Sequence, residues 1–305
     1  FCVTPAQATT HLEEVMGLLA AGGISVTNDA IQSATVNAML QAIDPRARIE
    51  PAGTGSTHLA LGPAVGPMET WSNGIIYLPI AELTPGAGSN VVALLNRAMT
   101  PGTTGIIIDL RKTGGEDLDS VAAIASFFVP PTNRPLFAVI ESPGERRDYP
   151  AIPVALVSTR PTIALIGTRT CGATELLAVL LRECPQVMLA GTNTVGYGRL
   201  LSSHPLTDGR RLMLPTRQLV FAGDRDFDGI GIVPDIVVRP ESVATNDEPP
   251  KMNTGGKPLT AETAADQQIL QRIGNDTTLK QAVDLLLGIK ATHDIPSSAS
   301  GAPAR

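Results

Sequence analysis

The order of apolar and polar positions divides the chain into regions with different periodicities. Residues 9–43 carry apolar side chains at helical spacing, in two runs separated by Gly22-Gly23. From Gly74 onward, short and continuously apolar runs alternate with helical runs. Alternation of this kind predicts parallel strands that are buried on both faces. We therefore predict an α/β fold for the main part of the chain.

The same patterns predict individual elements. A first helix over 9–22 is followed by a second that begins at Thr27 or Asn28 and ends at Asp44-Pro45. Five apolar residues lie on one face of that second helix: Ile31, Val36, Met39, Leu40 and Ile43. The predicted strands are NGIIYLPIAEL, TGIIIDLR, PVALVST, TIALIG and QVMLAGT. The predicted helices between and after them are NVVALLNRAM, LDSVAAIASFFV, TELLAVLLREC and two in DQQILQRIGNDTTLKQAVDLLLGIK.

These elements predict four regions. Residues 1–50 form an N-terminal helical region, and residues 51–73 form a short connector rich in Gly, Pro, Ser and Thr. Residues 74–240 form the α/β core, which ends in hairpin-like material with an Asp208-Gly209 turn. Residues 241–305 are a linker followed by helices that pack on the core.

Composition narrows the class of protein. The 305 residues are 43% hydrophobic and 17% charged, as in a globular domain, and the formal net charge is −6. This negative charge argues against a nucleic-acid partner. No apolar run approaches the ~20 residues that span a bilayer. The cysteines Cys2, Cys171 and Cys184 have neither disulfide-framework nor metal-ligand spacing, and we expect no metal or other cofactor.

The stretch RTCGATELLA, residues 169–178, is the strongest candidate for a functional site. It follows the apolar run TIALIG and leads into a predicted helix. A sharp turn from a strand to a helix is where many hydrolases expose a nucleophile. Cys171 lies in this turn near a helix N-terminus, where a thiolate is favoured. Cys184 closes the same apolar helix and is expected to be a core residue.

Five segments, in their order along the chain, resemble motifs of one family. They are VNAMLQAIDPRARI, GIIYLPIAEL, GIIIDLRKTGG, TIALIGTRTCGATELLAVLLRECPQVMLAGTNTVGYGRL, and LTDGRRLMLPTRQLV with GIGIVPDIVV. The family is that of the C-terminal processing (tail-specific) peptidases, the S41 serine peptidases. The resemblance implies a ClpP/crotonase-like ββα-superhelix core, flanked by an N-terminal helical region and C-terminal helices. It also favours a periplasmic or secreted location, although the chain, which begins at Phe1, shows no signal peptide.

The chain departs from the family pattern in one whole block. Members usually carry a PDZ domain between the Asp-Pro helix and the entry strand. Only residues 51–73 lie there in this chain, too few for a PDZ fold. The usual module for capturing a substrate C-terminus by strand addition is therefore expected to be missing.

The resemblance also implies a Ser–Lys dyad, which this chain has replaced. The family elbow reads Ser-Ala-Ser-Ala-Ser-Glu, and aligning its last residue with Glu175 places Gly172 at the nucleophile position. The family turn Phe-Gly-Lys-Gly aligns with Val195–Gly198 and places Tyr197 at the lysine position. The two positions are 25 residues apart, which agrees with the family spacing. The family's oxyanion-hole amides would be those of Gly114 or Gly115, together with Ala173.

Three interpretations remain open at this point. The first is a peptidase homologue without peptidase activity, a pseudoenzyme in which the old cleft serves peptide binding, scaffolding or a structural role. The second is an active endopeptidase that cleaves unfolded or C-terminal peptide segments, with Cys171 as a substitute nucleophile. The third is an unrelated crotonase-like enzyme or structural domain. In the first two, the expected partner is an extended peptide or an unfolded protein segment, or another protein.

Overall fold

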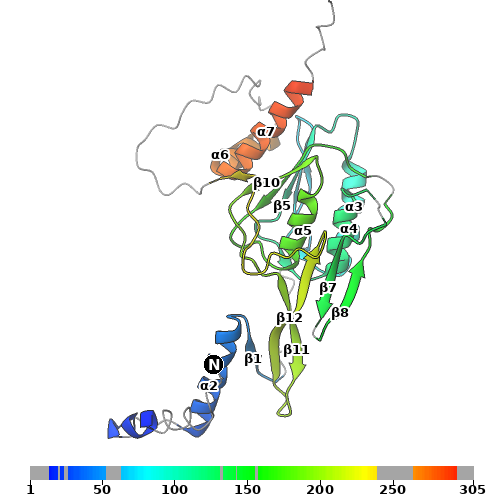
Figure 1. Cartoon of the computed structure of the whole chain (residues 1–305). Coiled ribbons are helices and arrows are strands. Elements are labelled where there is room, and N and C mark those ends of the chain that lie inside the picture. The colour runs from blue at the N-terminus through cyan, green and yellow to red at the C-terminus, as the bar shows by residue number, and fades with distance from the viewer. Residues whose placement is uncertain are drawn as a thin grey trace, which may run out of the picture. The chain divides into compact units, whose positions relative to one another are not determined.

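The computed structural model describes residues 14–19, 21–23, 27–52, 63–130, 133–141, 143–154, 157–238 and 264–293 (Figure 1). These residues form two compact units, which we describe separately. The smaller unit contains helix α2 (Asn28–Ile43), strand β1 (Arg48–Glu50) and residues 201–215 of a hairpin. The larger unit contains everything else that is described from residue 63 onward.

A six-stranded sheet forms the centre of the larger unit. Its strand order is β13-β10-β9-β5-β3-β2. All neighbouring strands are parallel except β2, which is antiparallel to β3. The strands are β2 (Glu69–Thr70), β3 (Ile75–Pro79), β5 (Gly105–Asp109), β9 (Thr162–Ile166), β10 (Val187–Gly191) and β13 (Ile236–Val237). The predicted parallel α/β core is therefore confirmed.

Alternate residues of each central strand enter two different hydrophobic clusters. In β5, Ile106 and Ile108 face one cluster, whereas Ile107 faces the other. In β9, Ile163 belongs to the second cluster and Ile166 to the first. Because both faces of the strands are covered, their sequences are continuously apolar.

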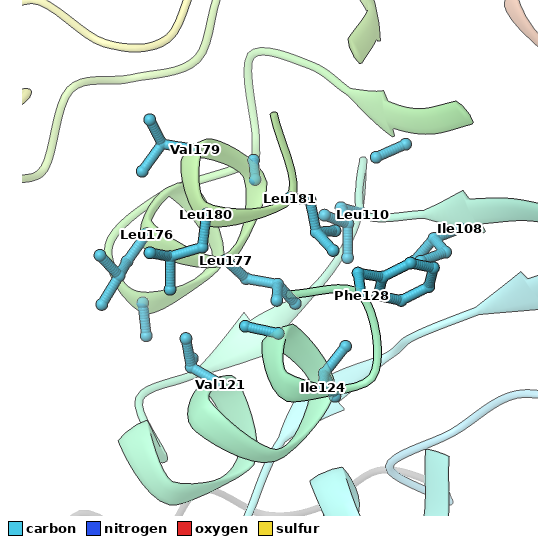
Figure 2. Close-up of a cluster of buried hydrophobic side chains, with 14 of the residues drawn as sticks. Ile108, Leu110, Val121, Ile124, Phe128, Leu176, Leu177, Val179, Leu180 and Leu181 are labelled. Atoms are coloured by element: carbon cyan, nitrogen blue, oxygen red, sulfur yellow. The ribbon is translucent and has the colours of Figure 1, made fainter. Parts of the chain in front are cut away.

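Helices α3 (Ala87–Ala98), α4 (Leu118–Ser126) and α5 (Ala173–Arg182) cover the first face. Figure 2 shows the leucines of α5 packed against Val121, Ile124 and Phe128 of the α4 region, with Ile108 of β5 beside them. The predicted helix LDSVAAIASFFV is confirmed up to Ser126, and residues 120–128 are all buried. This packing fixes the axis of α5 and hence the place of its first residue.

Helices α6 (Ala264–Asn275) and α7 (Thr277–His293) cover the second face of the sheet. Two arginines, Arg111 and Arg272, form ion pairs that attach these helices to the sheet. Arg111, just after β5, is bonded to Asp109 at 2.7 Å and to Asp276 at 2.7 Å. Arg272 of α6 is bonded to Glu69 at 2.6 Å, and its guanidinium lies over the Tyr77 ring. Asp109 and Arg111 therefore hold this strand end in place.

Protonation of the Glu69 and Asp276 carboxylates is disfavoured by their partners. The hydrogen bonds from Arg272 lower the pKa of Glu69 below its ordinary value. Burial alone would raise the pKa of Asp276, but hydrogen bonds from Arg111 and from the Leu279 N–H outweigh burial and lower it. The attachment of α6 and α7 therefore depends on ionised carboxylates.

An antiparallel sheet adjoins the core. In the larger unit, β7 (Phe137–Glu141) pairs with β8 (Glu145–Tyr149) and with residues 217–221 of β12 (Arg211–Phe221). Strand β11 (Arg199–Pro205) forms the predicted hairpin with β12. In the smaller unit, β1 pairs with residues 211–213 of β12. A last pair, β4 (Glu82–Leu83) and β6 (Gly114–Gly115), is parallel.

Some sequence-based expectations were wrong in detail. PVALVST, residues 153–159, was predicted as a strand, but none of its described residues is in one. The Ser158 N–H instead bonds the Phe127 carbonyl at the end of α4, so this described part of the segment is linked to a helix end. The connector 51–73 was expected to be irregular, yet Val65 bridges Ile80 and β2 joins the sheet. Residues 53–62 of the connector lie outside the described part.

The N-terminal helices are confirmed only where the structure describes them. Residues 14–19 are helical and α2 ends at Ile43 as predicted, whereas residues 1–13 lie outside the described part. Of the five apolar residues predicted on one face of α2, Leu40 is buried, but Met39 and Ile43 are 56% and 68% exposed. The linker 239–263 and the tail 294–305 also lie outside the described residues.

Candidate active-site elbow

The turn between β9 and α5 has the geometry of a catalytic elbow. Gly172, the residue before α5, has φ 59° and ψ −123°, a conformation that is unfavourable for residues with a side chain. The buried Thr170 hydroxyl holds the segment between β9 and Gly172 in place. It donates to the Leu110 carbonyl and accepts from the Gly167 N–H, both at 3.0 Å. A Cβ placed on Gly172 would meet only the Leu200 side chain, at 3.4 Å. There is thus room for a side chain at this position.

The carboxylate of Glu175 connects this elbow to a second segment. Glu175 is fully buried in the first turn of α5. It accepts hydrogen bonds from the Gly172 N–H at 2.9 Å, the Gly196 N–H at 2.6 Å and the Tyr197 N–H at 2.7 Å. The Thr194 hydroxyl donates a fourth. A Glu three residues after a helix N-cap is a capping signal that can be recognised in the sequence, and it accounts for the bond from Gly172 but not for the other three.

These bonds bring the two aligned positions together. The Gly172 and Tyr197 nitrogens bond the same Glu175 oxygen, at 2.9 and 2.7 Å, so they lie no more than about 5.6 Å apart. Residues that are 25 positions apart in the sequence are therefore neighbours in the structure. The Tyr197 side chain is 36% exposed.

The turn 194–198 is held on its other side by a second loop. The Gly229 N–H donates to the Gly196 carbonyl at 2.9 Å, and Gly231 packs against Thr194. A Cβ on Gly196, whose φ is +88°, would lie 2.7 Å from the Gly231 nitrogen. Gly198 is equally close to the backbone of Asp228. Glycine is needed at both positions because backbone lies where a side chain would begin.

The Gly114-Gly115 turn lies against the same helix, because β6 contacts α5. Gly115 has φ +83°, and a Cβ there would be 2.3 Å from the Leu83 carbonyl oxygen, so no other residue fits. The Gly114 N–H already donates to the Ala81 carbonyl at 2.9 Å. Ala173 is the first residue of α5, so its N–H has no acceptor within the helix. Of the three candidate oxyanion-hole amides, that of Gly114 therefore already has an acceptor, the Ala81 carbonyl beside the β4–β6 pair.

The two described cysteines beside α5 differ in environment. Cys184 is buried, as expected, and burial raises the pKa of its thiol to about 11. Cys171 is half-buried and adjoins Gly172. The elbow therefore offers a thiol next to the nucleophile position but no side-chain nucleophile at that position.

Other features of the described residues lie elsewhere. A surface hollow of about 810 Å³ is lined by the C-terminal half of α5 and residues 221–233, and Gly172, Tyr197, Gly114, Gly115 and Ala173 do not line it. Within the described part, no cluster of His, Cys, Asp or Glu is suited to hold a metal ion. Among the described helices, none has both the length and the apolar character needed to cross a membrane.

Comparisons with known proteins place this geometry in a family. The profile of peptidase family S41 matches residues 74–238, a range that includes the strands from β3 to β13. A chloroplastic C-terminal processing peptidase of Tetradesmus obliquus is 28% identical over 52% of this chain and 34% of its own length. A carboxyl-terminal-processing protease of Synechocystis is 26% identical over 53% of this chain and 37% of its own length. The matches thus span little more than a third of these relatives.

A solved structure supports the fold. A lipoprotein from Streptococcus agalactiae superposes with a TM-score of 0.54 at 20% identity, covering 70% of this chain and 79% of that one. The profile match covers more than half of the chain and contains the elbow, the Tyr197 turn and the Gly114-Gly115 turn. This chain belongs to peptidase family S41 and is a homologue of the C-terminal processing peptidases.

Proposed function

We propose that this chain is an S41 homologue without peptidase activity that uses its former active site to bind an extended peptide or an unfolded protein segment. The observation that carries the proposal is the pair of residues at the aligned positions, Gly172 and Tyr197. A glycine has no side-chain atom that can attack a carbonyl carbon. A tyrosine, with an ordinary pKa of about 10, is a poor base at neutral pH.

The backbone of the site could bind a peptide even without catalytic side chains. The elbow conformation at Gly172 and the closeness of the Tyr197 nitrogen are both retained. We propose the N–H groups of Gly115 and Ala173 as the oxyanion-hole-like donors, since the Gly114 N–H is already bonded. Such donors can hold a peptide carbonyl as well as a reaction intermediate.

We also propose that the core binds without a PDZ domain between α2 and β3. Part of the intervening segment belongs to the core itself, because Val65 bridges Ile80 and the Trp71 side chain is buried. The proposed regions remain 1–50, 51–73, 74–240 and 241–305. A peptide would then be recognised by strand pairing and by the elbow rather than by a separate capture module.

A gain-of-function experiment tests the proposal. Unfolded β-casein is incubated with the unmodified chain, with Gly172→Ser, with Tyr197→Lys and with the double replacement. We expect no cleavage by the unmodified chain or by either single variant, and measurable cleavage by the double variant. Cleavage by the unmodified chain would refute the proposed loss of activity.

The second candidate is a thiol peptidase that uses Cys171. The observation in its favour is that Cys171 is half-buried, not fully buried, and lies beside Gly172 at the start of α5. In such an enzyme the Cys171 Sγ would bond to the peptide carbonyl carbon, the C–N bond would break, and the thiol proton would pass to the leaving amine. Water would then hydrolyse the thioester and restore the thiol. The variant Cys171→Ala separates the candidates, because it would abolish cleavage by a thiol enzyme and leave peptide binding by a pseudoenzyme in place.

A further inference from the structure

One buried charge has no part in the proposed chemistry. Glu175 is fully buried and accepts four hydrogen bonds, three of them from backbone N–H groups. Burying a carboxylate is costly unless its oxygens are well bonded. Four donors around one side chain indicate that the surrounding segments are arranged to hold this charge.

Capping of α5 explains only one of these bonds. The bond from the Gly172 N–H is the local one expected of a Glu at the third helical position. The other three come from Thr194, Gly196 and Tyr197, which are 19 to 22 residues further along the chain. A helix cap has no need of partners from another segment.

The contacts continue from Thr194 to a third segment. The Thr194 hydroxyl, which donates to Glu175, accepts from the Ile232 N–H at 2.7 Å. The Gly229 N–H meanwhile bonds the Gly196 carbonyl. The carboxylate therefore connects the elbow to the 194–197 turn, and Thr194 and Gly196 connect that turn to the 229–232 loop.

We propose that Glu175 is the positioning residue of this site, whose carboxylate sets the separation between the elbow at Gly172 and the turn at Tyr197. All its bonds to these two residues are made with backbone N–H groups, so they do not depend on the side chains at positions 172 and 197. The frame of the site persists for this reason after the dyad is lost. The inference rests on the proposed function only in taking these two segments as the binding site.

Amide hydrogen exchange followed by NMR tests the inference in the unmodified sequence background. In Glu175→Gln an amide nitrogen replaces one acceptor oxygen, so N–H groups lose their partner. The lost oxygen is the acceptor either of the Gly172 and Tyr197 amides or of the Gly196 amide. We expect the amides that lose their acceptor to exchange roughly tenfold to a hundredfold faster, as expected for loss of hydrogen bonds to a charged acceptor. Amides of β9 and β10 should be unchanged. The matched control is Glu183→Gln, just after the same helix, whose carboxylate is exposed and bonds Arg225 at 2.8 Å.

Two results would overturn the inference. One is unchanged exchange at the three amides. The other is equal acceleration throughout α5, β9 and β10, which would make Glu175 a residue of general stability. Should Glu175→Gln fail to fold, Thr194→Val removes one donor and leaves the carboxylate. It should accelerate exchange at Gly196 and Tyr197 more than in β9, and equal rates would again overturn the inference.

A catalytic readout separates this inference from the proposed function. In the Gly172→Ser/Tyr197→Lys background, adding Glu175→Gln should lower kcat at least tenfold with little change in KM, because the two catalytic groups lose their alignment. A change in KM alone would contradict a positioning role. If the double variant cleaves nothing, the proposal of an intact scaffold fails, while the exchange measurement still decides the role of Glu175.

Discussion

Replacement of Gly172 by alanine tests whether the elbow is held in its strained conformation. At φ 59° and ψ −123° a side chain is disfavoured, at a cost of about 1–3 kcal/mol. The added Cβ meets only the Leu200 side chain at 3.4 Å, so steric overlap adds little. Reduced entropy of the unfolded chain returns about 0.4–1 kcal/mol. We therefore expect a net loss of about 1–2 kcal/mol of unfolding free energy.

Thermal unfolding followed by circular dichroism measures this loss. For a unit of this size, about 1–2 kcal/mol corresponds to a Tm lower by roughly 3–6 °C. Gly102→Ala is the matched control, because Gly102 has no positive φ and its nearest contact would be the Thr100 hydroxyl at 3.7 Å. Gly191→Ala should be far worse, since its Cβ would lie 2.0 Å from the Ile166 carbonyl oxygen. Equal Tm values for Gly172→Ala and Gly102→Ala would refute the elbow geometry.

Three further predictions follow from other parts of the structure. The folded-state pKa of Glu69 lies below that of the unfolded chain, so its stabilisation is complete above about pH 5 and is lost as the pH falls further. Glu69→Gln should therefore unfold at lower denaturant at pH 7 and show a weaker loss of stability between about pH 5 and pH 3; identical pH profiles would contradict this. Iodoacetamide should label Cys171 before Cys184 in peptide mass spectrometry, because the Cys184 thiol is buried with a pKa near 11, and equal labelling of the native protein would contradict its burial. Leu177→Ala should cost about 2–5 kcal/mol of unfolding free energy in urea titrations, since Leu177 is fully buried between α5 and α4, and a cost below about 1 kcal/mol would contradict this packing.

The central sheet could be predicted from the sequence because each strand is a continuous apolar run. GIIID and TIALI are buried on both faces, so the local pattern reflects the packing directly. The strand ERRDY of β8 has the opposite character, with four of its five residues exposed, and it resembles a polar loop in the sequence. PVALVST shows the converse error: it has the composition of a strand, yet its described residues 153–154 and 157–159 are in none, and the Ser158 N–H bonds the Phe127 carbonyl.

The order of the motifs predicts that Gly172 and Tyr197 lie close together, but it does not predict the hydrogen bonds that connect their segments. The order of the family motifs pairs Gly172 with Tyr197 in the sequence. In the structure the backbone nitrogens of both residues bond the same carboxylate oxygen of Glu175. The role of Glu175 could not be predicted in full, because only its capping bond is local in the sequence. The Arg111–Asp276 ion pair, which fastens the last helices, joins residues 165 positions apart and leaves no local pattern.

The most direct test of the central claim is mass spectrometry of a proteolysis reaction. Unfolded β-casein is incubated at neutral pH with the unmodified chain and with Cys171→Ala, and its fragments are quantified over time. The account predicts no fragments above those of a buffer control in either reaction, together with binding of the casein by both proteins. Fragments produced by the unmodified chain, and absent with Cys171→Ala, would contradict it and establish a thiol peptidase.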